Sequence, residues 1–218
     1  MSRTNRRRAL RAVAPVAGLL AAGLLVWQGS YAAFSATTTN QADSWEAGTL
    51  TLTNNGGTGT FAATTGALIT AQNIKPGDTQ TRCLTVDSTG TSGGDLAMYR
   101  GAVTNTDGLT ANGGVGLSDR LGVTVRAAVL GAGETVVANC QAGAVAGSVD
   151  FPGTSTVVAN ALLDGLPTAY GPAAKTTITA GQRVAYQISW TFVSGGTTAL
   201  DNPYQGAKSV ADLVWEIQ

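Results

Sequence analysis

Apolar and polar residues alternate along much of the chain after residue 45. The clearest alternation covers residues 121–129, 186–192 and 211–217, where every second side chain is aliphatic or aromatic. A period of two is that of a β-strand with one buried face, so the pattern predicts three core strands. Weaker alternation predicts further strands at residues 45–52, 60–70, 82–86, 96–103, 135–138 and 156–163.

Turn residues separate these segments. Residues 54–59 are rich in Asn and Gly, and in residues 73–78 Pro76 fixes φ while Gly77 can adopt a positive φ. Many short strands with turns between them, and no long helical period after residue 30, predict an all-β fold. We expect one domain, residues 45–218, built as a two-sheet antiparallel sandwich of jelly-roll type.

The first 32 residues follow a different pattern. A head with five arginines precedes 16 apolar residues, 12–27, and Ser30 and Ala32 then supply small side chains at the two positions that a signal peptidase recognises. Residues 1–32 are therefore predicted to be a secretory signal helix that is cleaved after Ala32, with Ala33 as the alternative. An uncleaved membrane anchor is disfavoured, because the apolar run is shorter than the roughly 20 residues needed to cross a bilayer. A pair of arginines in the head leaves twin-arginine export open.

Cleavage changes the charge balance of the chain. The full sequence has 13 basic and 13 acidic residues, but five basic residues lie in the signal segment and every acidic residue follows it, so the mature chain carries a net charge of −5. An acidic chain without a Lys/Arg cluster lacks the electrostatic signature of a nucleic-acid binder. We expect no nucleic acid among its partners, and contact with a membrane only through the signal segment before cleavage.

Cys83 and Cys140 are the only cysteines. In an exported chain such a pair is predicted to form a disulfide, and closing the loop between them would stabilise the fold by about 4 kcal/mol. A reactive or metal-binding thiol pair is disfavoured, because the spacing matches no redox or zinc motif. Since Cys83 is out of phase with Leu84 and Val86, the bridge is expected to tie a sheet face or edge to the irregular middle region, outside the main core.

The chain contains no histidine. This excludes a Ser-His-Asp triad, a His-activated cysteine and an HExxH zinc site. The remaining catalytic candidates are carboxylates that stand mostly beside Gly, Ser or Asn, where Asp commonly bonds its own backbone in turns: Asp87, Asp95, Asp107, Asp119, Asp150, Asp164 and Asp201. We predict that the protein is not an enzyme and has no cofactor, catalytic or metal site, while incidental calcium binding by scattered loop oxygens stays open.

Four short segments carry a family resemblance. In chain order they are residues 29–35 (GSYAAFS), 45–52 (WEAGTLTL), 73–78 (NIKPGD) and 202–206 (NPYQG). Together they make the chain similar to the TasA/camelysin family of exported proteins. The middle of the chain fits that family only by its strand pattern.

The resemblance implies a jelly-roll domain, processing by a dedicated signal peptidase of the SipW type, and assembly of subunits into extracellular biofilm or cell-surface fibres. In fibre-forming relatives the mature N-terminal segment leaves its own domain and completes a sheet of the next subunit. Two features depart from the family pattern: Ala36 stands where an acid usually follows the Phe-Ser pair, and the cysteine pair is not a general mark of the family. Some members are described as metalloproteases, an activity that does not carry over to a chain without histidine.

Residues 33–44 are the candidate donor strand. They have mostly short side chains, no Gly or Pro and one charge, Asp43, and Phe34 is the expected anchor. An open sheet edge exposes unpaired N–H and C=O groups, which an extended strand from a neighbour satisfies. Head-to-tail donation does not close on itself and therefore gives filaments. The donor residues are Ala33, Phe34, Ser35, Thr37 and Thr39. In the alternative, the segment is an unpaired leader or pairs with its own sheet.

Two functions of different kinds follow from these features. The first is a secreted structural protein at the cell surface or in the extracellular space, whose partners are further copies of itself and a signal peptidase. The second is a monomeric secreted binding module for wall glycan or a host surface, which would use Tyr99, Tyr170 or Tyr204 in loops.

Overall fold

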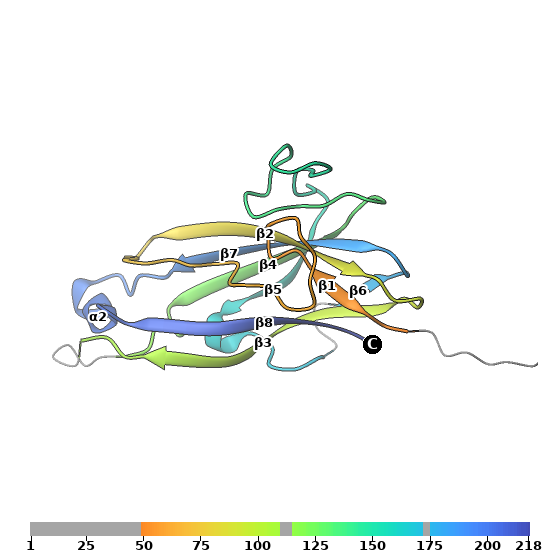
Figure 1. The fold of residues 1–218 in the computed structure, drawn as a ribbon. Coiled ribbons are helices and arrows are strands. Elements are labelled where there is room, and N and C mark those ends of the chain that lie inside the picture. The colour runs from red at the N-terminus through yellow and green to blue at the C-terminus, as the bar shows by residue number, and fades with distance from the viewer. Residues whose placement is uncertain (1–48, 110–114, 172–174) are drawn as a thin grey trace, which may run out of the picture. The chain divides into compact units, whose positions relative to one another are not determined.

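Two antiparallel β-sheets form the described domain. The computed structural model describes residues 49–109, 115–171 and 175–218. One sheet has the strand order β1-β2-β7-β4-β5 and the other the order β6-β3-β8, and they lie as two layers (Figure 1). The strands are β1 (Leu52–Asn54), β2 (Thr79–Ser88), β3 (Gly94–Thr106), β4 (Leu121–Val129), β5 (Thr156–Leu162), β6 (Lys175–Ile178), β7 (Arg183–Phe192) and β8 (Lys208–Ile217).

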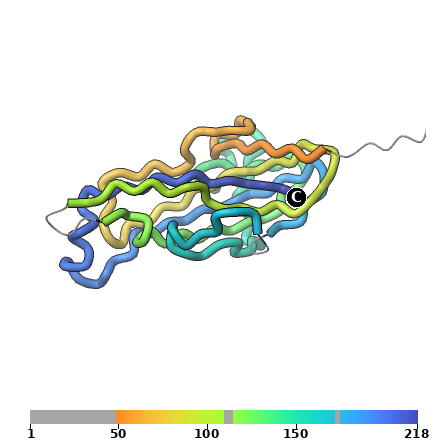
Figure 2. The backbone as a smooth tube through the Cα atoms, turned by 90° about the horizontal axis from the view of Figure 1, so that it is seen from below, coloured from red at the N-terminus to blue at the C-terminus, as the bar shows by residue number. Residues whose placement is uncertain are grey.

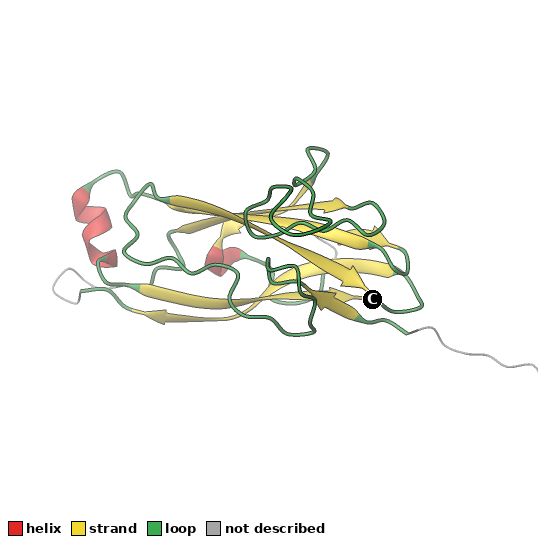
Figure 3. Ribbon diagram, turned by 45° about the horizontal axis from the view of Figure 1, so that its top comes forward, coloured by secondary structure: helices red, strands yellow, loops and turns green. Residues whose placement is uncertain are grey.

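Helical structure in the described residues is confined to short turns. The 3-10 turn η2 (Leu163–Gly165) follows β5, and the helix α2 (Thr198–Asp201) continues into the 3-10 turn η3 (Asn202–Tyr204) before β8 (Figure 3). No helix within the described ranges is long and apolar enough to cross a membrane. The predicted signal helix lies outside the described residues.

The core lies between the two sheets. Alternate apolar side chains of the facing strands fill it: Leu84 and Val86 of β2, Leu96 and Met98 of β3, Val123 and Val125 of β4, Tyr186, Ile188, Trp190 and Phe192 of β7, and Ile217 of β8. Tyr186 and Trp215 join the layers through an edge-to-face contact with ring centroids 5.6 Å apart. Burial raises the pKa of the Tyr186 hydroxyl, so this group stays neutral inside the core.

The alternation in the sequence identified the central strands. Residues 121–129 form β4, and residues 186–192 and 211–217 lie within β7 and β8. The weaker segments at residues 82–86 and 96–103 lie within β2 and β3, and the segment predicted at residues 156–163 forms β5 except for Leu163, which begins η2. The prediction of an all-β domain with two antiparallel sheets is therefore confirmed.

The strand predicted at residues 60–70 is wrong. A single bridge between Asn54 and Ala62 is the only pairing there. Gly56, Gly57 and Gly59 all have positive φ, so the chain turns sharply after β1 and does not continue as a strand.

The predictions for residues 135–138 and 45–52 also need correction. Residues 135–138 form no strand, because the backbone N–H of Val136 donates to the Thr85 side chain and only Thr135 makes a bridge, to Ser148. Of residues 45–52, Leu52 alone lies in a strand; residues 49–51 do not, and residues 45–48 lie outside the described ranges. The short strand β6 was not predicted.

The chain enters β1 along the turn between β2 and β3. The Thr89 N–H donates to the Thr51 carbonyl at 2.9 Å, and the Ser92 N–H donates to the Thr49 carbonyl at 3.1 Å. A Cβ atom on Gly90 would collide with the Thr49 carbonyl oxygen. Gly90 therefore fixes how closely residues 49–51 lie against this turn.

Gly90→Ala is expected to destabilise the domain by about 1–3 kcal/mol, because the added methyl group pushes the entering chain off the turn. Urea unfolding of the two proteins measures this difference. Gly66→Ala is the matched control, because a Cβ there meets no atom within 4 Å. Equal losses for the two substitutions would show that the contact with Thr49 is unimportant.

Candidate functional site

A cleft of about 250 Å³ lies between β1 and β8. The three residues of β1 form one wall, residues 213–215 of β8 form the opposite wall, and Val86 and Ala63 complete the lining. In Figure 2, β8 (blue) lies beside β3 (yellow-green), and β1 also contacts β8. β1 is an edge strand of the five-stranded sheet and β8 is an edge strand of the three-stranded sheet. The cleft therefore lies between one edge of each sheet.

Two buried polar atoms of the cleft lack partners. Neither Thr53 Oγ1 nor Trp215 Nε1 has a hydrogen-bond partner among the described residues. Each such buried group costs about 1–3 kcal/mol when it is left unpaired. Both atoms belong to residues that line the cleft and are themselves buried.

The outer edge of β8 is also open. Within the described residues β8 pairs with β3 on one side, and β1 pairs with β2 and makes no ladder with β8. Val210, near the start of β8, is 50% exposed. An edge of ten residues that is unpaired within the described structure, and that lies beside a cleft, is a surface on which an extended segment can add a strand.

A second feature is the cap, which we define as residues 131–155. It crosses the outer face of β2 and β7, seen as the green loop above these strands in Figure 1. The predicted disulfide is confirmed: Cys83 of β2 is bonded to Cys140 of the cap. Its position outside the main core is confirmed as well, because Cys83 packs in a separate small cluster with Leu130, Val136 and Ala185.

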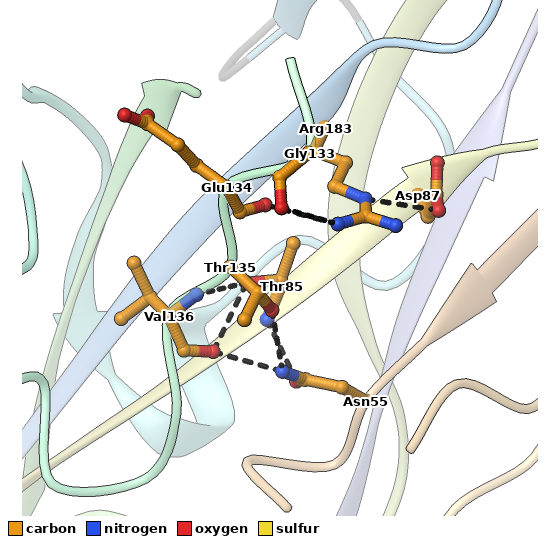
Figure 4. A network of polar contacts seen from close by, with 8 residues as sticks. All are labelled: Asn55, Thr85, Asp87, Gly133, Glu134, Thr135, Val136 and Arg183. Carbon is orange, nitrogen blue, oxygen red and sulfur yellow. Dashed lines mark hydrogen bonds and ion pairs between the residues drawn. The ribbon is translucent and has the colours of Figure 1, made fainter. Parts of the chain in front are cut away.

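A buried polar network fastens the cap (Figure 4). The Asn55 side chain is fully buried and uses all its bonding capacity. Its amide donates to Thr135 Oγ1 at 3.2 Å and to the Val136 carbonyl at 2.8 Å, and its oxygen accepts from the N–H groups of Gly57 at 3.0 Å and Thr85 at 2.8 Å. Asn55 thus joins the loop after β1, strand β2 and the cap.

Arg183 makes a second set of contacts with the cap, at the other end of the network. Its Nε lies 3.0 Å from Asp87 Oδ2, and its Nη1 donates to the carbonyls of Gly133 and Glu134 at 3.1 and 3.2 Å (Figure 4). The guanidinium also lies over the Phe61 ring, 4.7 Å from its centroid. The cap is therefore held both covalently and by charge-assisted hydrogen bonds.

The residues singled out for cleavage and donation lie outside the described residues. These are Ser30, Ala32 and Ala33 for cleavage, and Ala33, Phe34, Ser35, Thr37 and Thr39 for donation. They stay predictions. Thr53 and Trp215 of the cleft and Asn55 of the polar network were not singled out from the sequence, where their neighbours are typical of strands and turns.

The three tyrosines proposed for ligand binding are not alike. Tyr170 lies in a loop as expected, but Tyr99 lies in β3 and its hydroxyl donates to Glu216 at 2.9 Å. This hydrogen bond raises the pKa of Tyr99. Tyr204 lies in η3, is 9% exposed and donates to Asp119 at 3.0 Å. The placement of Tyr99 and Tyr204 in loops is therefore wrong.

Several of the candidate carboxylates make structural contacts. Asp87 and Asp95 lie in β2 and β3, which corrects their placement in turns, and Asp87 is the partner of Arg183. Asp201, in α2, accepts from the Gly195 N–H at 2.7 Å, and this bond holds its pKa below the usual value. Within the described ranges no group of three or more acidic or cysteine side chains is placed to hold a metal ion.

The comparison with protein families decides the chain's relationship. A family model described as camelysin metallo-endopeptidase matches residues 10–139. The chain belongs to the camelysin family. The match confirms the resemblance found in the sequence and spans β1 to β4 and the first part of the cap. No curated protein sequence matches the chain.

The camelysin description implies a metal ion, which this chain does not fit. Zinc peptidase sites use histidine with carboxylate ligands, and the sequence contains no histidine. Both cysteines are consumed in the disulfide. We derive no hydrolytic step from the family description.

Proposed function

We propose that this camelysin-family chain is a secreted structural subunit, not a peptidase, that polymerises into extracellular or cell-surface fibres. In this proposal a signal peptidase of the SipW type removes residues 1–32, and residues 33–44 of each subunit then add to the next subunit as a strand. The acceptor is the cleft between β1 and β8, together with the open edge of β8. The partners are further copies of the same chain.

The strand order supports this proposal most directly. The orders β2-β7-β4-β5 and β6-β3-β8 are those of an eight-stranded jelly roll, in which the first strand lies beside the last. Here β1 has three residues and pairs with β2, so the place beside β8 has no strand among the described residues. We infer that the domain is a jelly roll whose missing strand comes from a neighbour.

The length of the proposed donor segment, residues 33–44, is sufficient to span β8. At about 3.3 Å per residue, residues 33–44 extend over roughly 40 Å and β8 over roughly 33 Å. The donor brings one charge, Asp43, and we assign Phe34 to the cleft, where its ring would cover the lining residues Leu52 and Leu213. Backbone carbonyls of the donor would accept from the N–H groups of the β8 edge.

Binding of a synthetic peptide of residues 33–44 to a chain that begins at residue 45 tests the acceptor. We expect the peptide to bind, to slow amide hydrogen exchange in β8 and to change Trp215 fluorescence. Thr53→Arg should weaken binding at least tenfold, about 1.4 kcal/mol, because the long side chain fills the cleft. Hydrogen exchange and fluorescence titration measure both effects.

Val157→Arg is the matched control. Val157 is 55% exposed on β5, at the far edge of the five-stranded sheet, and receives the same side chain and charge. We expect this variant to bind the peptide as the parent does. Absence of peptide binding by the parent, or equal weakening by both variants, would rule out the cleft as the acceptor.

A further inference from the structure

Only a few specific contacts hold the cap against the rest of the domain. Of its residues only Thr135, Val136 and Val137 are buried, and it contains no strand. The cluster beneath it is small and separate from the main core. Ordering so long an irregular segment costs conformational entropy that these contacts must offset. The disulfide lowers that cost by closing the loop between Cys83 and Cys140 in the unfolded chain.

One stretch of the cap lies between β2 and the loop after β1. On one side, Cys83 N–H donates to the Ala138 carbonyl at 3.3 Å, and Thr85 Oγ1 accepts from Val136 N–H at 2.7 Å. On the other side, Ala138 N–H donates to the Gly57 carbonyl at 2.9 Å. The disulfide at Cys140 therefore holds in place the residues that contact this loop.

Asn55 links the cap to the cleft between β1 and β8. Its side chain bonds the cap at Thr135 and Val136 and bonds Thr85 of β2, while its own N–H donates to the Thr85 carbonyl at 3.0 Å. The residue before it, Asn54, ends β1 and lines the cleft. Since β1 has three residues, its position depends on what holds its end.

We propose that the Cys83–Cys140 disulfide controls whether the acceptor cleft is formed. In the oxidised chain the cap holds Asn55, and Asn55 holds β1 in place as one wall of the cleft. In the reduced chain the cap loosens, β1 loses its support and the subunit does not accept a donor strand. Assembly is thereby restricted to an oxidising, extracellular setting. The inference rests on the proposed function for its link to assembly, but not for the link from the disulfide to β1.

The chemistry is ordinary thiol–disulfide exchange. Oxidation joins the two Sγ atoms, and the two protons and two electrons lost pass to a disulfide oxidant that becomes two thiols. A dithiol such as dithiothreitol reverses the reaction and is itself oxidised to a cyclic disulfide. Cys140 is half-buried and Cys83 fully buried, so attack is expected at the Cys140 sulfur.

Hydrogen exchange of the freshly purified mature chain, with and without dithiothreitol, tests the link to β1. Reduction is expected to speed exchange at residues 53–57 and 135–138 by about tenfold or more, while β4 and β7 change little, because local openings differ in free energy across a fold. The variant Cys83→Ala/Cys140→Ala should behave as the reduced chain does. In Asn55→Ala, reduction should add nothing further at residues 53–57.

Filament formation by the same samples tests the link to assembly. Oxidised chain should form filaments visible by electron microscopy, and reduced chain should form at least tenfold less by light scattering. Equal exchange at residues 53–57 in both redox states would overturn the inference, as would loss of protection across β4 and β7 on reduction, which would make the disulfide a general stabiliser. Absence of filaments from oxidised chain would count against the proposed function alone, and the exchange result would still decide the link to β1.

Discussion

Deleting residues 33–44 from the mature chain is expected to abolish filaments. The cleft between β1 and β8 and the free edge of β8 then have no strand to receive, so subunits lose the contact that joins one to the next. The domain itself should stay folded, because every described strand and core residue lies at or beyond Leu52. Negative-stain electron microscopy measures filaments, and circular dichroism with thermal unfolding checks the fold.

A Gly/Ser segment of the same length is the control for this deletion. It keeps the N-terminus at its natural distance but supplies neither Phe34 nor a strand-forming sequence. We expect it to behave as the deletion does. Filaments from either variant at the level of the parent would show that residues 33–44 are not the donor. Adding free peptide 33–44 should occupy the acceptors of the deleted chain without making filaments, because it joins no two subunits.

The alternating pattern predicted strands wherever a strand has one face on the core. Residues 121–129 and 186–192 contribute a side chain to the core at nearly every second position, so a period of two appears in the sequence itself. The disulfide pairing followed from composition, and its place outside the core followed from the phase of Cys83 against Leu84. These inferences needed only the local periodicity and the number of cysteines, which is why they succeeded.

The contacts of the cap and of the cleft depend on distant residues. Asn55 stands among Gly and Asn in a sequence typical of a turn, and nothing local indicates that it bonds Thr135 and Val136 some 80 positions away. Residues 135–138 resemble a strand because Thr135, Val136 and Val137 are β-branched. They form none, since the backbone groups of Val136 bond the Thr85 and Asn55 side chains, which no periodicity reveals. Trp215 fits the alternation of β8 equally well as a core residue and as a wall of the cleft.

Asn55→Ala is expected to destabilise the domain by about 3–4 kcal/mol. The substitution removes four hydrogen bonds and leaves the buried N–H groups of Gly57 and Thr85 without their acceptor, at about 1–3 kcal/mol each. The Val136 carbonyl keeps its bond from Thr85 Oγ1, which limits the loss. Urea unfolding monitored by tryptophan fluorescence measures the change in the free energy of unfolding. Asn54→Ala is the matched control.

Asn54 is chemically identical to Asn55 and adjacent to it, but only part-buried. Its side-chain oxygen accepts from the Gly56 N–H at 3.0 Å and the Thr65 hydroxyl at 2.8 Å, within its own loop. Its replacement by Ala should therefore cost about 1–2 kcal/mol, the value of two ordinary hydrogen bonds that are not fully buried. The difference between the two variants isolates the contribution of the link between β1, β2 and the cap. If both cost the same, the cap is not anchored through Asn55, and β1 must be held in place by its pairing with β2 alone.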